Sequence, residues 1–202
     1  MATQARGGAA QTDERYWLLQ ALAVLVSPRA VFASLRDDSD DAARARSEAV
    51  LALVLLAGIA SILWAPNVGR LHNDQLVQWD ALLISIVVFF GGAIYGMAAY
   101  WVAGLVLHAA ASPFRLTRSY RQARHLLAFA AAPVALSLFV VWPIRLAVYG
   151  EDLFKAGGSD RGAGNYVFVG VELFFVAWAL GLLLLGLATV RSKASSSAGG
   201  IS

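Results

Sequence analysis

The stretch ALLISIVVFFGGAIYGMAAYWVAGLVLHAAA, residues 81–111, decides the fold of this chain because it contains no aspartate, glutamate, lysine or arginine. As one helix it would measure about 46 Å, which exceeds the roughly 30 Å hydrocarbon core of a bilayer. One tilted helix or two short helices could fill it. A division at Gly91 and Gly92 would leave a first piece of about ten residues, too short to span. We therefore favour one long transmembrane helix.

Three further stretches have the length and composition of membrane spans. They cover residues 49–65, 126–149 and 166–190. Pro133 lies inside the third of the four spans and predicts a kink there, because proline removes a backbone hydrogen bond. With 59% hydrophobic and only 14% charged residues, the chain carries more apolar surface than a soluble domain of 202 residues can bury. We predict an all-α fold, a polytopic bundle of four transmembrane helices.

The part before the first span has a different character. Residues 16–26 form a mostly apolar run that, as a helix, reaches only about half of the hydrocarbon thickness. We expect this run, followed by a second short segment over 29–35, to lie in the interface as an amphipathic helix. The acidic block at 37–41 lacks apolar periodicity and is expected to be a solvated connector. The predicted organisation is a disordered N-terminus (1–12), an interfacial segment with its connector (13–47), a transmembrane domain (48–190) and a disordered tail (191–202).

Basic residues are distributed unevenly between the connections. Six arginines precede the first span and four separate the second from the third, whereas the other two loops carry three basic residues between them. Lysine and arginine favour the cytoplasmic side, so both termini are expected to be cytoplasmic in a multi-pass protein of the plasma membrane. The frequent Ala, Arg and Gly suggest a bacterial source. The net charge of only +3 argues against a nucleic-acid partner.

Four arginines form a basic cluster between the second and third spans: Arg115, Arg118, Arg121 and Arg124. Arg118, Arg121 and His125 have the spacing of one helix face. Such a patch would attract anionic lipid head groups at about 1 kcal/mol per basic residue. The favoured alternative is that these arginines only set the topology.

Two charged residues, Arg145 and Glu172, lie within apolar surroundings in the third and fourth spans. Both fall at similar depth, roughly 6–9 Å below one membrane face. An isolated charge at the bilayer centre costs about 2.5–3.5 kcal/mol, which predicts an intramembrane ion pair between these spans. The pair could form an ion or proton site in a polar cavity, but we favour a structural pair or snorkelling of each residue to the interface.

The second span also carries Gly91, Gly92 and Gly96, of which the last two have GxxxG spacing. Small residues at this spacing let another helix backbone approach closely. The neighbour could be a helix of the same chain, which we favour, or a second subunit.

Several kinds of chemistry are not indicated. The chain has no cysteine, so disulfides, thiolate metal sites and cysteine catalysis are excluded. His72 and His108 lack partners at metal-ligand spacing, and the glycines of the 150–165 loop do not form a phosphate loop. Neither a nucleophile motif nor a paired set of intramembrane carboxylates is present. We predict no cofactor, no metal and no enzyme activity.

The order of three features resembles the Ypt-interacting-protein (Yip) family of polytopic membrane proteins. These features are LVSPRAVFASL at residues 25–35, the glycine-rich second span, and Ser119-Tyr120-Arg121 leading through AFAAAP at 128–133 into the third span. The family typically has five spans, whereas four are expected here. The resemblance implies a non-catalytic membrane protein; eukaryotic relatives engage small GTPases and the membrane-traffic machinery, and prokaryotic relatives have largely undefined roles.

Two functions are therefore considered. The first is a scaffold or accessory subunit that binds the lipid bilayer, other membrane proteins or a second copy of itself. The alternative is a small transporter or channel component that uses Glu172 and Arg145 in a polar cavity.

Overall fold

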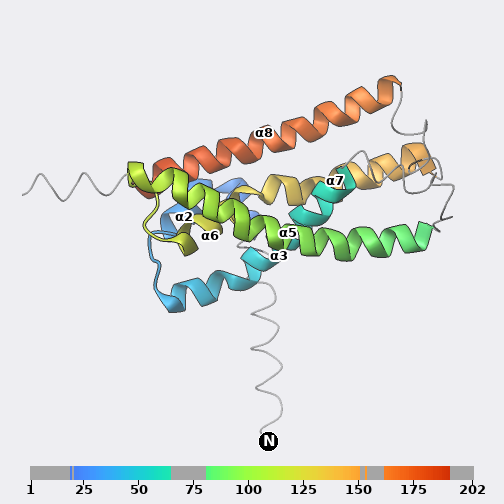
Figure 1. Cartoon of the computed structure of the whole chain (residues 1–202). Helices are drawn as coiled ribbons and strands as arrows, with labels where there is room; N and C mark the ends of the chain where they lie inside the picture. Colours follow the sequence, from blue (N-terminus) through green and yellow to red (C-terminus); the bar gives the residue numbers. More distant parts are fainter. Residues whose placement is uncertain (1–18, 20, 65–80, 151–152, 154–161, 192–202) are drawn as a thin grey trace, which may run out of the picture. The chain divides into compact units, whose positions relative to one another are not determined.

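The computed structural model of the chain describes residues 19, 21–64, 81–150, 153 and 162–191. Every regular element in this part is helical, so the predicted all-α class is confirmed. Residues 21–26 are helical as well, ahead of the first labelled helix. In chain order (Figure 1) the elements are α2 (Pro28–Ser34), α3 (Asp40–Trp64), α5 (Ala81–Ala111), the 3₁₀ turn η1 (Ser112–Phe114), α6 (Tyr120–Ala130), α7 (Ala132–Tyr149) and α8 (Ala163–Arg191).

Four stretches of the described chain are long and apolar enough to cross a membrane. They are Asp40–Trp64, Leu83–Phe114, Tyr120–Tyr149 and Ala163–Arg191. The predicted count of four spans is confirmed. The long uncharged stretch is one helix, as predicted, because α5 runs without interruption through its glycines.

Helix α3 begins at Asp40, nine residues before the predicted start of the first span at residue 49. The prediction that the acidic block at 37–41 is a connector was therefore wrong for Asp40 and Asp41, which belong to the helix, although both side chains are exposed. The Ser39 hydroxyl accepts a hydrogen bond from the Ala42 N–H at 3.4 Å, and Asp40 and Asp41 occupy the first turn, where carboxylates are stabilised by the helix dipole. Alanine and an arginine, Arg46, take the buried positions of this extension. A face made of alanine and arginine has no periodic pattern of large apolar residues, so the sequence pattern does not reveal it.

The third span is broken at Ala131, where α6 ends and α7 begins. The Ala131 N–H donates to the carbonyls of Leu127 and Ala128 at 3.0 and 3.2 Å, which tightens the last turn of α6. Pro133 follows two residues later; it has no N–H to donate, and its ring crowds the carbonyl four residues earlier. The kink predicted near Pro133 is confirmed as this break.

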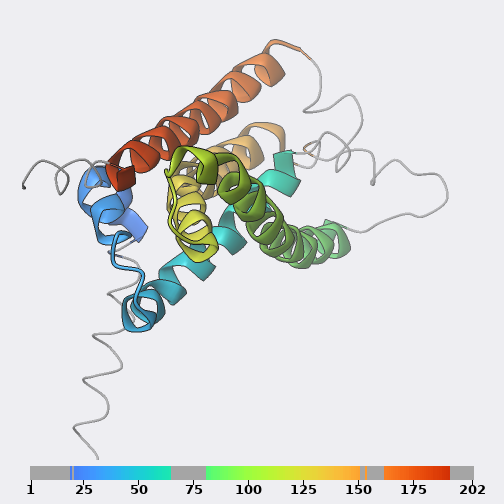
Figure 2. The ribbon, with the colours of Figure 1, turned by 60° about the vertical axis from the view of Figure 1, so that its left-hand side comes forward.

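The chain divides into two compact units, and unit 1 comprises Met1–Leu53, Ala103–Ala132 and Leu182–Ser202. Its described part holds α2, α6 and portions of α3, α5 and α8. The side chains of Phe32, Leu126 and Phe129 are fully buried in it. Figure 2 shows α2, in blue, beside the red end of α8, where the Phe32 ring lies against Gly186.

Unit 2 comprises Val54–Val102 and Pro133–Gly181, with portions of α3, α5, α7 and α8 in its described part. Its core is a cluster of Ile59, Ile84 and Val88, against which side chains of α3 and α7 pack. Large apolar side chains are exposed on α5 and α8 of this unit, among them Phe89, Phe90, Ile94, Phe174 and Leu180. An outward apolar surface of this kind is expected where helices face lipid.

The N-terminal helical segment has two faces. Ala21 and Val24 are buried, whereas Leu22 and Val26 are 45% and 85% exposed. Pro28 opens α2 at a position where a missing N–H has no cost. The interfacial location of this segment stays a prediction. The predicted disorder of residues 1–12 and of the tail beyond Arg191 lies outside the described residues, and so does most of the glycine-rich loop at 150–165.

Candidate functional site

Helices α3 and α5 approach closely in unit 2, at three glycines. A Cβ added at Gly58 of α3 would collide with backbone atoms of Gly92 and Gly96 of α5, and a Cβ at Gly92 would lie 2.5 Å from the Cα of Ile59. The GxxxG pair thus packs against a helix of the same chain. Gly91 is placed differently, because the nearest atom to its added Cβ is a side-chain carbon of Ile62 at 3.9 Å. Sequence reasoning missed Gly58, since a single glycine carries no spacing signal.

The two intramembrane charges meet in unit 2. Nη1 of Arg145 on α7 lies 2.8 Å from Oε1 of Glu172 on α8. The residues are only 9% and 6% exposed. The guanidinium carbon also lies 4.9 Å from the ring centre of Trp142 and 5.5 Å from that of Phe168. Trp142 precedes the arginine by three residues on α7, so helix spacing supplies that cation–π contact, whereas Phe168 lies on α8 and contacts the guanidinium across the two helices.

The pair does not use all of its polar atoms. Among the described residues, Nε of Arg145 and Oε2 of Glu172 are buried and have no hydrogen-bond partner. The Trp64 indole lies near the same carboxylate, and both residues line one cavity. A buried polar atom without a hydrogen bond is costly, so these two atoms call for a partner.

A cavity of about 20 Å³ lies beside Glu172. Two serines line it, and each donates its hydroxyl to its own helix: Ser61 to the Ala57 carbonyl and Ser137 to the Val134 carbonyl, both at 2.7 Å. The other lining residues are mostly apolar or aromatic: Ala60, Trp64, Val134, Trp142, Phe175 and Val176. Glu172, whose Oε2 has no hydrogen-bond partner among the described residues, thus shares the lining of this cavity with two serines.

A second polar centre lies in unit 1; we name it the polar junction and define it as residues 34–40 with their partners on α3, α6 and α8. Buried Arg46 of α3 donates to the carbonyls of Ser34 and Asp37, both at 2.7 Å. Gln122 of α6 donates to the Leu35 carbonyl at 2.9 Å. From within the junction, Nε of Arg36 donates to the Thr189 carbonyl of α8 at 3.1 Å, close to the helix end. The connector between α2 and α3 is thus held by three helices.

Arg121 completes the polar junction with its carboxylate partners. Its Nε lies 2.9 Å from Oδ1 of Asp38, and its Nη1 lies 2.5 Å from Oδ1 of Asp40. The Ser119 hydroxyl, which caps α6, donates to the other oxygen of Asp38. The Ser39 N–H donates to Asp37 at 3.0 Å and holds the pKa of that carboxyl below its ordinary value.

The structure separates the four arginines of the basic cluster. Arg115 and Arg118 are exposed, and Arg115 adopts a left-handed backbone with φ of 54° at the end of η1. Arg121 is engaged by carboxylates, and the guanidinium of Arg124 lies 4.6 Å from the ring centre of Tyr120. The prediction that Arg118 shares a helix face with Arg121 was wrong, because Ser119 caps α6 and Arg118 lies before the helix.

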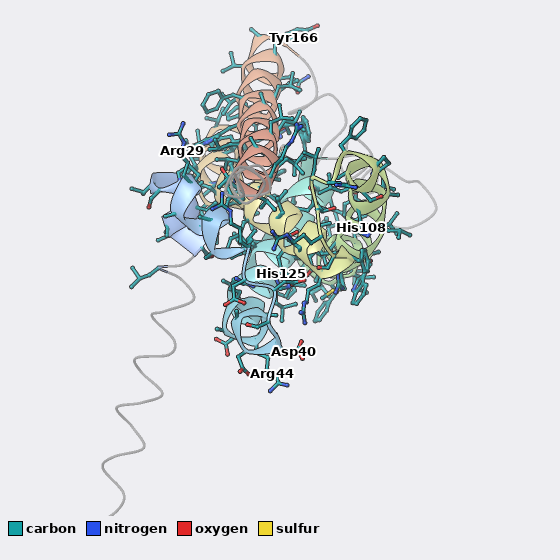
Figure 3. All side chains as sticks on the ribbon, turned by 90° about the vertical axis from the view of Figure 1, so that its left-hand side faces the viewer. Arg29, Asp40, Arg44, His108, His125 and Tyr166 are labelled. Carbon is teal, nitrogen blue, oxygen red and sulfur yellow. The ribbon has the colours of Figure 1, made fainter. Side chains whose placement is uncertain are left out.

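The two described histidines, His108 and His125, have no metal-ligand arrangement. His125 is buried among the helices of unit 1, and His108 bonds through Nδ1 to the Thr117 hydroxyl at 3.1 Å (Figure 3). His72 lies outside the described residues. Across the described residues, no group of three or more His, Asp or Glu side chains is placed to hold a metal ion.

Charge differs sharply between the described parts of the two units. Unit 1 carries nine arginines and five acidic residues there, a surplus of four positive charges, whereas unit 2 carries only Arg145 and Glu172. Arg29 and Arg44 lie on the outside of unit 1 (Figure 3). One unit is therefore suited to an aqueous surface with anionic groups, and the other to hydrocarbon.

The comparison with known families agrees with this architecture. The Yip1 domain matches residues 22–201, which covers the N-terminal segment, all four spans and most of the tail. No curated protein and no solved structure matches the chain. The described residues contain four candidate spans, one fewer than the five that are typical of the family this sequence resembles. By the extent of the match, the chain belongs to the Yip1 domain family of membrane proteins.

Proposed function

We propose that this Yip1 domain protein is a non-catalytic scaffold or accessory subunit that binds lipids and other membrane proteins. The observation that carries the proposal is the composition of unit 2. Its described charged residues, Arg145 and Glu172, form a pair with each other, while large apolar side chains of α5 and α8 remain exposed. Such a surface supports packing against lipid tails or another helix, and it offers no acid, base or nucleophile set.

The positive surplus of unit 1 favours a cytoplasmic location for this unit and for both termini. We place the protein in a plasma membrane of bacterial type. Exposed Arg115 and Arg118 follow Phe114, which is 69% exposed in the turn between α5 and α6. An apolar ring beside two cations suits the interface, where the ring enters the acyl boundary and the guanidinium groups meet head-group phosphates. The lipid patch is thus proposed to consist mainly of these two arginines.

Native mass spectrometry of the purified protein, released from nanodiscs of mixed lipids, tests the proposal. We expect retained anionic phospholipid, and cross-linking in native membranes is expected to capture a reproducible protein partner or a second copy. A protein that keeps neither anionic lipid nor any partner would contradict the scaffold role.

A small transporter or channel component is the second candidate, because Glu172 lines a cavity with one carboxylate oxygen unpartnered among the described residues. Flux into liposomes that is lost in Glu172→Gln, at unchanged incorporation of the protein, would favour this function. Flux equal to that of empty liposomes would count against it.

A further inference from the structure

We infer that the cavity beside Glu172 is a binding site for one water molecule, which donates a hydrogen bond to Oε2 of Glu172. The inference does not depend on the scaffold role. For the second proposed function, a transporter or channel component, it limits the possible substrates to those that the cavity can hold. Its basis is a buried carboxylate oxygen without a partner among the described residues, at the wall of a cavity in unit 2.

The wall of the cavity carries both kinds of hydrogen-bonding group, because Trp64 and Trp142 line it with indole N–H donors and the other polar side chains are acceptors. Oε2 of Glu172 is an acceptor, and the hydroxyls of Ser61 and Ser137 have already donated their protons to helix carbonyls. Each serine oxygen keeps lone pairs that can accept. An occupant that satisfies this wall must donate to the acceptors and can accept from an indole N–H, and water does both with two donors and two acceptor lone pairs.

The size of the cavity excludes an organic solute. Its volume is about 20 Å³, and about 10–15 Å³ on this measure is needed to hold one water. A water with two to four polar partners is the usual occupant of a buried polar void, whereas an apolar void stays empty. The residues that line this cavity include a carboxylate and two hydroxyls, so it is a polar void and is expected to hold water.

Charge balance excludes a bound cation. Arg145 already neutralises Glu172 through the 2.8 Å ion pair, so a sodium or ammonium ion would bring an uncompensated charge into an apolar wall. Water adds hydrogen bonds without adding charge. If the chain moves any substrate through this site, the substrate is water or a proton passed along it.

Radiolytic footprinting of the whole protein in ¹⁸O-water tests the inference, because hydroxyl radicals formed from a bound water label the side chains beside it. We expect ¹⁸O label on Phe175, which lines the cavity, and none on Phe129, a fully buried phenylalanine in the core of unit 1. When irradiation follows dilution into ordinary water at increasing delays, incorporation of ¹⁸O into Phe175 should fall more slowly than incorporation into Tyr166, which is 77% exposed near the start of α8. Absence of label on Phe175 would overturn the inference.

Two cavity-filling variants distinguish bound water from bulk solvent. Ala60→Val places extra carbon at a wall position that is 3% exposed, and Val176→Ile fills the same cavity from α8. The expected result is loss of the Phe175 label in whichever filler folds, while Ala177→Val on the exposed side of α8 retains it. Label retained in a folded filler would overturn the inference.

A titration with small cations completes the test. Sodium or ammonium chloride, titrated against choline chloride at constant ionic strength, is expected to leave the Phe175 label unchanged. A saturable loss of label with either small cation would show that the site takes a cation and would overturn the assignment of water.

Discussion

Breaking the Arg145–Glu172 pair on one side should destabilise the protein strongly, whereas removing both charges should not. The residues are 9% and 6% exposed and 2.8 Å apart, so Arg145→Met leaves an uncompensated buried carboxylate and Glu172→Leu leaves an uncompensated guanidinium. Each single variant is expected to lose about 3–5 kcal/mol of unfolding free energy, whereas the double variant stays near the wild type or exceeds it by about 1–4 kcal/mol.

The coupling energy follows from these values. Two independent losses would sum to roughly 6–10 kcal/mol, so a double variant near the wild type implies a coupling of about 6 kcal/mol or more. The assay is equilibrium unfolding in mixed micelles of fixed composition, with Arg115→Met as the exposed control, for which a change within about 0.5 kcal/mol is expected.

Single variants that each lose less than about 1 kcal/mol, the value typical of exposed pairs, would refute the reasoning. The charges would then be hydrated or snorkelling. A double variant as unstable as the sum of the two singles would refute it as well, because the charges would then act independently.

Three other perturbations have defined outcomes. Gly58→Val should cost at least about 1–3 kcal/mol of stability, because the added side chain meets the α5 backbone. Gly91→Ala should change the stability by no more than about 0.5 kcal/mol, as read from denaturation midpoints. Equal effects of the two substitutions would contradict the close approach of α3 and α5. Arg121→Gln should lower the melting temperature of the protein, with a larger decrease at low salt than at high salt; a salt-independent decrease would exclude the ion-pair explanation. Arg115→Gln and Arg118→Gln should each weaken binding to anionic nanodiscs about fivefold and leave binding to neutral nanodiscs unchanged; equal losses on both would indicate misfolding.

The spans were predictable because each is decided locally. An uncharged stretch of sufficient length specifies a membrane helix, and Pro133 interrupts backbone bonding wherever a helix surrounds it. The α8 bounds, Ala163–Arg191, extend the predicted 166–190 by only a few residues. The start of α3 could not be predicted because its buried face carries alanine and Arg46. These residues do not give the pattern of large apolar side chains that indicates a buried helix face.

The site was predictable only in part. The depth of Arg145 and Glu172 along their helices indicated that they could meet, and the structure brings them together. Their cavity could not be foreseen, because its wall also includes α3 residues far away in the sequence. The polar junction joins Asp38 to Arg121 across 83 positions, and no helical spacing encodes such a contact. For the same reason, the sequence could not show that the four arginines of the basic cluster have different surroundings.

The central claim is that four helices cross the membrane with the arginine-rich connections in the cytoplasm, and single-cysteine accessibility tests it most directly. The chain has no native cysteine, so Ser39→Cys, Ser112→Cys and Ala163→Cys each report one position. In intact cells a membrane-impermeant maleimide should label only Ala163→Cys, and all three should react after permeabilisation. Labelling of Ser112→Cys in intact cells, or protection of Ala163→Cys together with the other two, would contradict the four-span account.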